Sequence, residues 1–194
     1  MQEAAAAFMR AQGLPDVVIA NAGVSRGTLT EYAEDVESFR QVMDINVLGM
    51  VNTFHPFITP MRERGSGSLV GIASVAGYRG LPGAGAYSAS KAAAIRYCES
   101  LRVELRGSGV QVTTVCPGYI ATPMTAKNPY KMPFIIPVDE FARRCLRAID
   151  ARKSLVVIPW RMAIVARLLM ILPNFIFDAV ASRAGRKPRK SGPA

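Results

Sequence analysis

The sequence predicts an α/β protein built on a parallel β-sheet. Apolar runs of strand length alternate along the chain with segments of helical periodicity. Turns rich in glycine and other small residues separate the two kinds of segment. The chain has 194 residues, 50% of them hydrophobic, which is enough for one core. We therefore expect one domain, or most of one, in which helices connect parallel strands.

The chain opens with an expected helix and an expected strand. Residues 2–12 are rich in alanine, a strong helix former, and Gly13 follows as a residue that ends helices. The apolar run 16–20 then predicts a strand. A long helical stretch is expected from Thr30, which is suited to a helix N-cap, to about Asn46. A second helical stretch continues it as far as the next glycines.

The second half of the chain predicts strands that alternate with helices. Residues 68–73 have the composition of a buried strand, and Ser74 follows directly. The small residues of the loop 76–86 let the backbone approach a ligand closely. The remaining elements are expected as a helix at 87–106 and strands at 110–116 and 155–158. Ser74 thus lies at the carboxyl end of a strand, where open α/β sheets bind their ligands.

Tyr87, Lys91 and Ser74 have the pattern of a proton-transfer site. Residues four apart share one face of a helix, so the Lys91 ammonium can lie near the Tyr87 phenol and favour its ionised form. A phenol of ordinary pKa ~10 then becomes a usable acid or base near neutral pH. Ser74 can hydrogen-bond a substrate carbonyl beside the same phenol. The pattern indicates redox chemistry between a carbonyl and an alcohol.

With three further signatures in the same order, these residues resemble the short-chain dehydrogenase/reductase family. The Asn-Ala-Gly turn at 21–23 is similar to a conserved turn of that family, and Asn46 falls at its fourth catalytic position. The Pro-Gly pair at 117–118 is similar to the family's turn beneath the nicotinamide. A lone Tyr-x-x-x-Lys is common by chance, so the order of all five signatures carries the resemblance.

The resemblance implies an oxidoreductase that uses NADP(H) or NAD(H) to move a hydride to or from a substrate carbon. Tyr87 would be the acid or base, and Lys91 would tune it and hold the ribose hydroxyls of the cofactor. Ser74 would orient the carbonyl, and Asn46 would anchor a water that relays protons. The implied cofactor-binding residues are Asn21, Ala22, Gly23, Tyr87, Lys91, Pro117, Gly118, Ile120 and Thr122. The family also implies a homo-oligomer, paired through the helices that bear Asn46 and Tyr87.

The glycine-rich cofactor motif of the family is absent from this sequence. In the family that motif follows the first strand, whereas the strand expected at 16–20 is similar to the fourth. The missing strands and helices would take about 60–70 residues. We therefore expect an incomplete Rossmann-like, doubly wound sheet with an unpaired, aggregation-prone edge.

Two functional readings remain open. In the first, the chain is part of an oxidoreductase that begins upstream of Met1. In the second, it is a non-catalytic relic or an interaction protein that does not bind a cofactor.

The few cysteine and histidine residues exclude a metal site. Cys98, Cys116 and Cys145 are far apart and lack the spacing of metal ligands. The single histidine, His55, leaves no partner for a zinc site or a hydrolase triad. We expect three cysteines of the core, no metal, and a cytoplasmic protein without a secretory signal.

Residues 121–137 predict either a loop that covers the substrate or an ordinary packed loop. The segment contains prolines at 123, 129, 133 and 137. Its apolar side chains are Met124, Tyr130, Met132, Phe134, Ile135 and Ile136. A small apolar carbonyl or alcohol substrate would suit such a covering.

The C-terminal part of the chain carries most of the positive charge. From Asp139 onward there are twelve Lys and Arg residues against four Asp and Glu, a surplus of eight in a net charge of +10. We expect a partial oxidoreductase domain at 1–159, an apolar helical extension at 160–181 and a basic, disordered tail at 182–194. The basic residues of this tail are Arg183, Arg186, Lys187, Arg189 and Lys190.

The apolar extension allows two interpretations. Residues 162–172 are almost wholly apolar but too short to cross a bilayer, which takes about 20 residues. The region could lie on an anionic membrane surface, with Trp160 at the interface and the basic tail on lipid headgroups. Alternatively, it packs on the domain or on a second subunit. Specific nucleic-acid binding is not expected, because no known recognition module is present.

Overall fold

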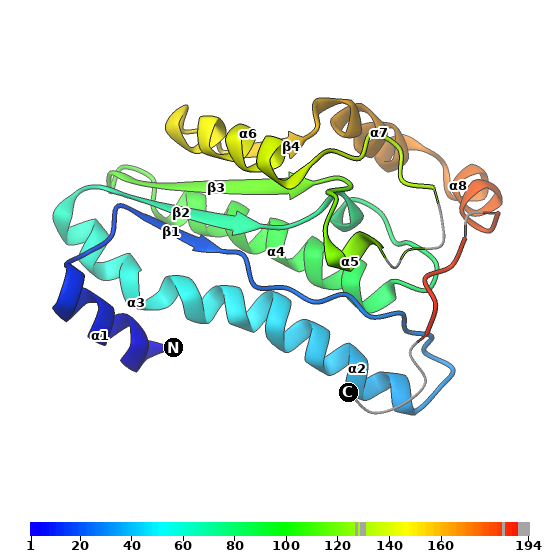
Figure 1. Ribbon diagram of the computed structural model, residues 1–194, viewed down its shortest axis with the longest axis horizontal. Helices are drawn as coiled ribbons and strands as arrows, with labels where there is room; N and C mark the ends of the chain where they lie inside the picture. Colours follow the sequence, from blue (N-terminus) through cyan, green and yellow to red (C-terminus); the bar gives the residue numbers. More distant parts are fainter. Residues whose placement is uncertain (127, 129–130, 184, 190–194) are drawn as a thin grey trace.

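The centre of the protein is a sheet of four parallel strands. The computed structural model describes residues 1–194 apart from 127, 129–130, 184 and 190–194. In that part of the chain the strand order is β1-β2-β3-β4, and all neighbours are parallel (Figure 1). The strands are β1 (Val17–Ala20), β2 (Gly67–Ile72), β3 (Val110–Pro117) and β4 (Leu155–Ile158). The predicted α/β class with a parallel, doubly wound sheet is confirmed.

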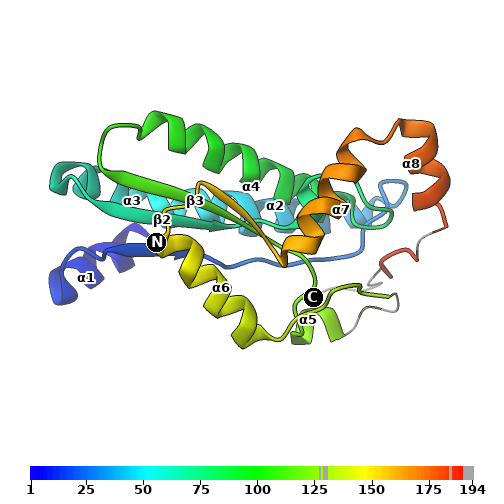
Figure 2. The same ribbon diagram turned by 90° about the horizontal axis from the view of Figure 1, so that it is seen from above.

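Helices cover both faces of this sheet. They are α1 (Gln2–Gln12), α2 (Glu34–Met43), α3 (Gly49–Arg64), α4 (Gly85–Glu104), α5 (Pro123–Ala126), α6 (Val138–Asp150), α7 (Trp160–Ile171) and α8 (Asn174–Ala181). A π-helical turn, η1 (Asp44–Leu48), joins α2 to α3, and a 3-10 turn, η2 (Val75–Gly77), follows β2. Helices α2, α3 and α4 lie on one side of the sheet and α6 on the other (Figure 2).

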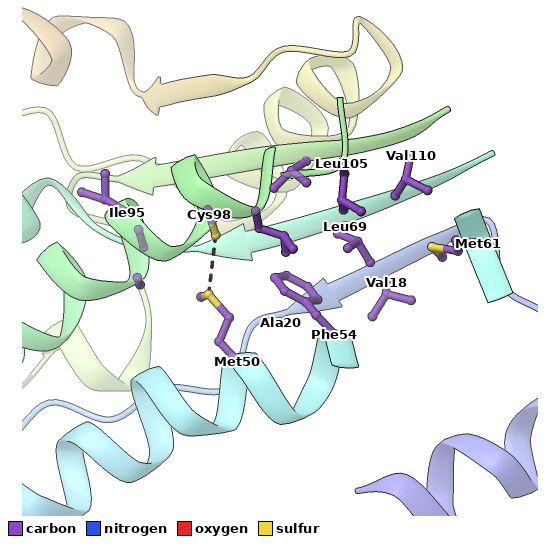
Figure 3. Packing of buried hydrophobic residues seen from close by; sticks show 14 of the residues in the cluster. Val18, Ala20, Met50, Phe54, Met61, Leu69, Ile95, Cys98, Leu105 and Val110 are labelled. Atoms are coloured by element: carbon purple, nitrogen blue, oxygen red, sulfur yellow. Dashed lines mark hydrogen bonds between the residues drawn. The ribbon is translucent and has the colours of Figure 1, made fainter. Parts of the chain in front are cut away.

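The main core lies between the sheet and helices α3 and α4. Phe54 of α3 and Leu69 of β2 are fully buried there, and Cys98 of α4 lies 3.6 Å from the sulfur of Met50 (Figure 3). A Cβ on Gly71 would lie 2.5 Å from the Cys98 sulfur, so this glycine lets α4 approach the sheet closely. A smaller apolar cluster fills the space under α6.

The three cysteines are core residues, as predicted. Cys98, Cys116 and Cys145 are all buried and unpaired, as small core residues are. Among the residues that the structure describes, no group of His, Cys, Asp or Glu has the arrangement of a metal site.

Several helix boundaries differ from the sequence-based expectation. Helix α2 begins at Glu34 rather than at Thr30. The carboxylate of Asp35 accepts a hydrogen bond from the Leu29 amide at 2.8 Å, so the acidic first turn of α2, not Thr30, organises this end. Helix α6 was not predicted, although Phe141, Cys145 and Ile149 have helical spacing and all contact the apolar cluster beneath it.

Strand β1 is an edge strand in the described part of the chain. It pairs only with β2 there. Val17 and Ile19, on the face away from the main core, are 42% and 45% exposed. The edge is exposed as predicted, whereas its tendency to aggregate and the pairing of two copies stay predictions.

The segment 160–181 forms α7 and α8, which pack beside the carboxyl end of the sheet. Helix α7 contacts β4 and η2. Arg79, just after η2, lies 4.3 Å from the ring centroid of Phe177 in α8 and donates a 2.8 Å hydrogen bond to the side chain of Asn174. No helix in the described ranges is both long and apolar enough to cross a bilayer.

Residues 185–189, which belong to the region predicted as a disordered tail, follow the surface of the domain. The backbone at Arg189 forms a parallel bridge with Gly27, and the red segment of Figure 1 returns toward the start of α2. Lys190, also predicted as part of the tail, lies outside the described residues.

Candidate active site

A cavity of about 570 Å³ lies at the carboxyl ends of the strands. Its walls come from the turn after β1, the end of β2, the first turns of α4 and the segment after β3. Every residue predicted to bind a cofactor lines it: Asn21, Ala22, Gly23, Tyr87, Lys91, Pro117, Gly118, Ile120 and Thr122. Ser74 lines it as well. The fold therefore gathers residues from distant parts of the sequence around one cavity.

Ser74 and Tyr87 both line this cavity, and their side chains form a hydrogen bond. Ser74 caps η2, because its hydroxyl accepts a hydrogen bond from the Ala76 amide at 3.1 Å. Tyr87 lies in the first turn of α4. Burial raises the pKa of the Tyr87 phenol, and a hydrogen bond with Ser74 opposes that rise only in part. The phenol is therefore protonated at neutral pH.

Lys91 lies one turn further along α4 and is only 4% exposed. Its Nζ donates a 2.8 Å hydrogen bond to the carbonyl of Ile72, at the end of β2. The same atom is 5.8 Å from the centroid of the Tyr87 ring. Burial lowers the pKa of Lys91 to about 8.

These pKa directions differ from the expectation that Lys91 favours an ionised Tyr87. Burial acts on the two groups in the same sense, because it disfavours both the phenolate and the ammonium. The loss of solvation is the largest cause of both shifts. The two residues share a helix face, as predicted, but their common burial determines their protonation.

Asn46 lies behind the cavity wall rather than on it. It is 1% exposed and belongs to the π-helical turn η1. Its Oδ1 accepts from the Val24 amide at 2.8 Å, and its Nδ2 donates to the Val24 carbonyl and to Ser90 Oγ, both at 2.9 Å. Because both donors of the amide are used, Asn46 holds the loop after β1 against α4. π-Helical turns of this kind occur often near functional sites.

Gly23 brings the backbone of that loop against the polar side chains of the site. A Cβ at this position would lie 3.3 Å from both Asn46 Oδ1 and Lys91 Nζ. This is closer than most side chains tolerate, so the glycine keeps the cavity open beside the lysine. From the sequence, the role of the Asn-Ala-Gly turn could be predicted only from its resemblance to a family.

Several site residues were missed by sequence reasoning. Val138 and Phe141, at the start of α6, line the cavity. A smaller adjoining pocket of about 100 Å³ is lined by Ser74 and Tyr87 and also by Lys187. Lys187 is 100 positions from Tyr87, and no local pattern marks such a contact.

Described residues of the segment 121–137 line the same region. Helix α5 belongs to it, and a bridge between Ile120 and Ile136 closes its two ends. Met124 lines both the cavity and the smaller pocket. Tyr130, which was predicted to contribute, lies outside the described residues.

The fold and this cavity define an α/β protein with a cavity at the carboxyl ends of its parallel strands, where open α/β sheets bind their ligands. The family model for short chain dehydrogenases matches residues 1–132, and the chain belongs to this family.

Similar proteins come from bacteria and mammals. An uncharacterized oxidoreductase of Myxococcus xanthus is 42% identical over 87% of this chain and 66% of its own length. Dehydrogenase/reductase SDR family member 7B of Mus musculus is 35% identical over 97% of this chain and 61% of its own length. The chain thus spans less than two thirds of these curated relatives.

A solved structure has the same arrangement. It is a short chain dehydrogenase from Burkholderia cenocepacia in complex with NADP, 29% identical to this chain, with a TM-score of 0.79. The match covers 93% of this chain and 74% of that one.

Proposed function

We propose that the protein is an NAD(P)(H)-dependent oxidoreductase in which Tyr87 transfers a proton to or from the oxygen of a carbonyl or alcohol substrate. The observation that carries the proposal is the convergence of Ser74, Tyr87 and Lys91 on one cavity. The family membership and the NADP complex of the Burkholderia relative support it.

The residues around the cavity fit a nicotinamide cofactor. The backbone of the 21–23 turn approaches Lys91 so closely that a Cβ on Gly23 would fill the space. The Lys91 ammonium would hold the ribose hydroxyls, and Pro117, Ile120 and Thr122 would contact the ring and its carboxamide. When bound, the cofactor supplies the hydride.

The side chains of this protein orient the substrate and transfer the proton. Ser74 orients the substrate oxygen toward the phenol of Tyr87. Because burial keeps that phenol protonated, the resting site is prepared to donate a proton, as carbonyl reduction requires. In the opposite direction the Lys91 ammonium must offset the burial so that the phenol can lose its proton.

The relic interpretation is disfavoured by the buried lysine. A desolvated ammonium without a carboxylate partner destabilises a folded protein. Lys91 is nevertheless held in place by the Ile72 carbonyl at the cavity wall. A destabilising residue held at a site is typical of function.

The first test is a turnover assay on the protein as its own cells make it. We expect NADPH or NADH to be oxidised in the presence of small apolar ketones or aldehydes, measured by the near-ultraviolet absorbance of the reduced nicotinamide. A fluorescence titration of each cofactor shows binding separately from turnover. Binding of neither cofactor would overturn the proposal and favour the non-catalytic alternative.

A membrane-surface role is favoured by the outer face of α7. Exposed apolar side chains recur there at helical spacing, at Trp160, Ile164, Leu168 and Ile171. Ile171 is 76% exposed, and Phe175 of α8 is 74% exposed. Helix α7 contains Arg161 and Arg167 but no acidic residue. An apolar stripe with basic neighbours suits the headgroup region of an anionic bilayer.

Liposome co-sedimentation tests this role. At low salt we expect the protein to pellet with vesicles that contain phosphatidylserine, and to be released as the salt concentration rises. The double variant Ile171→Ser, Phe175→Ser should remain in the supernatant. Val103→Ser, at an exposed apolar position of α4, is the matched control and should pellet normally. Absence of co-sedimentation of the unmodified protein would remove the membrane role.

A further inference from the structure

We propose that residues 185–189 form a strap that places Lys187 in the substrate pocket, where it selects carbonyl substrates that carry a carboxylate. This inference rests on the proposed oxidoreductase function and narrows its substrate class to oxo acids. The rest of the substrate is apolar, in keeping with the lining of the cavity.

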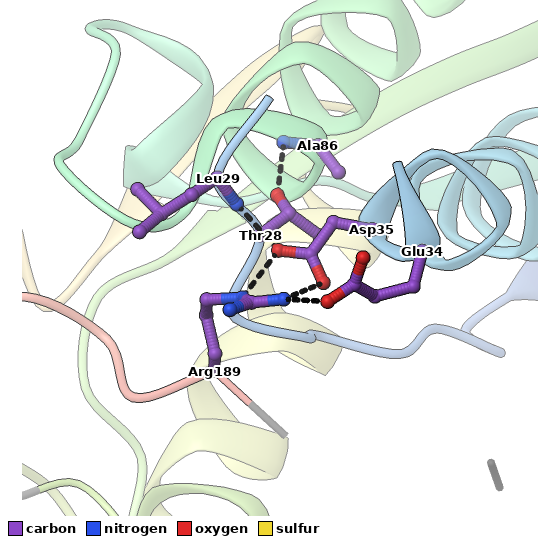
Figure 4. Close-up of polar contacts among 6 residues, drawn as sticks. All are labelled: Thr28, Leu29, Glu34, Asp35, Ala86 and Arg189. Carbon is purple, nitrogen blue, oxygen red and sulfur yellow. Dashed lines mark hydrogen bonds and ion pairs between the residues drawn. The ribbon is translucent and has the colours of Figure 1, made fainter. Parts of the chain in front are cut away.

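An ion cluster anchors the end of the strap. Arg189 Nε lies 2.8 Å from Asp35 Oδ2, and Arg189 Nη2 lies 2.8 Å from a carboxylate oxygen of Glu34 (Figure 4). The Arg189 guanidinium also stacks 3.5 Å from the centroid of the Tyr32 ring. Hydrogen bonding to Arg189 is the largest cause that lowers the pKa of Asp35. The strap is therefore held at the start of α2, a region 154 residues away in sequence.

Two loops accommodate the backbone of the strap. A Cβ on Gly27 would lie 2.2 Å from the carbonyl oxygen of Pro188. A Cβ on Gly83, which has a φ of +72°, would lie 2.8 Å from the carbonyl oxygen of Lys187. Because any larger residue at either position would displace the strap, the glycines of both loops permit its close approach.

This path brings Lys187 next to the proton donor. The side chain is partly buried, and its Nζ lies 5.7 Å from the centroid of the Tyr87 ring. The ammonium donates a hydrogen bond to the hydroxyl of Ser25. Because the Lys187 ammonium lies so near the Tyr87 ring, only a few bonds can separate the reacting carbonyl from a substrate group that binds Lys187.

The charge around Lys187 favours an anion. In the described part of the chain Lys187 has no carboxylate partner, and its one side-chain hydrogen bond is to a neutral hydroxyl. Its pockets are lined by further cations, Arg26, Lys131 and Arg183, and by no described acidic residue. Two ammonium protons remain for a ligand. A carboxylate would relieve both the loss of solvation and the uncompensated positive charge.

Matched acid and ester substrates test the inference. For an oxo acid and its methyl ester, the unmodified protein should favour the acid in kcat/KM by roughly tenfold or more, the ratio expected for a charged hydrogen bond. Lys187→Met should lose this preference, because its kcat/KM should fall much more for the acid than for the ester. Gly27→Ala, which displaces the strap, should have the same effect. Arg186→Met, at an exposed position of the same strap, is the matched control and should keep the preference.

A binding measurement separates this inference from the proposed function. Calorimetric titration with octanoate and octanamide needs no turnover, and octanoate should bind more tightly to the unmodified protein than to Lys187→Met. If Lys187→Met loses the preference for octanoate and the unmodified protein shows no turnover, the oxidoreductase function is refuted and the Lys187 site is retained. Equal acid-to-ester ratios in the unmodified protein and in Lys187→Met would overturn the inference, even in an active enzyme.

Discussion

Tyr87→Phe is expected to lower kcat by about 10²–10⁴-fold, the usual contribution of a positioned general acid. Phenylalanine keeps the ring that lines the cavity but lacks the hydroxyl that donates the proton. Lys91 and the 21–23 turn stay in place, so the affinity for NADPH or NADH should be nearly unchanged. Steady-state kinetics and a cofactor titration on the same preparation measure the two effects separately.

Tyr97→Phe provides the control on the same helix. Tyr97 stacks on Phe54 at a centroid distance of 6.4 Å, on the core side of α4. Loss of its hydroxyl should leave kcat close to that of the unmodified protein. Near-normal turnover of Tyr87→Phe would show that another group transfers the proton.

Lys91→Met should stabilise the folded protein and abolish most of its activity. Burial lowers the pKa of Lys91 from 10.5 to about 8, which corresponds to a cost of about 3 kcal/mol at neutral pH. Loss of the hydrogen bond to the Ile72 carbonyl offsets roughly 1 kcal/mol of the gain. A net gain of about 2 kcal/mol in the free energy of unfolding is therefore expected at pH 7.

The pH dependence of this gain follows from the direction of the pKa shift. The folded state binds the Lys91 proton less tightly than the unfolded state, so the cost is fully present below the folded pKa of about 8. It decreases as the pH rises toward 10.5, where the unfolded lysine also loses its proton. Urea denaturation of both proteins at several pH values should show that the gain in stability is lost in alkaline solution, where only the effect of the missing hydrogen bond remains.

An exposed lysine serves as the control for this series. Lys153→Met, in the turn after α6, should change the stability little at any pH. A Lys91→Met variant that is less stable than the unmodified protein at pH 7 would show that the ammonium is well solvated or paired in the folded state.

Much of the fold and part of the cavity wall could be predicted from local patterns. Helix α1 and strand β4 have the predicted bounds, and the other predicted strands differ by one or two residues. Tyr87 and Lys91 share a helix face because their spacing matches the helical period. Ser74 follows a strand whose carboxyl end must lie at the ligand edge of a parallel sheet.

Other features depend on contacts that no short segment contains. Helix α2 starts late because Asp35 binds the Leu29 amide and the distant Arg189. The side chain of Asn46 forms hydrogen bonds with Val24 and Ser90. Its position behind the cavity therefore depends on how η1, the loop after β1 and helix α4 pack together. The strap was predicted as a disordered tail because basic composition alone is typical of solvated chains.

The sequence by itself determined the α/β class, the order of the strands and most helices, and the group of Ser74, Tyr87 and Lys91 at the cavity. These follow from helical and strand periods and from the rule that parallel strands place ligands at one edge. Only the tertiary structure decided the direction of the pKa shifts of Tyr87 and Lys91 and the placement of Lys187 beside them. Protonation depends on how completely a group is removed from water, and that is set by neighbours distant in the chain.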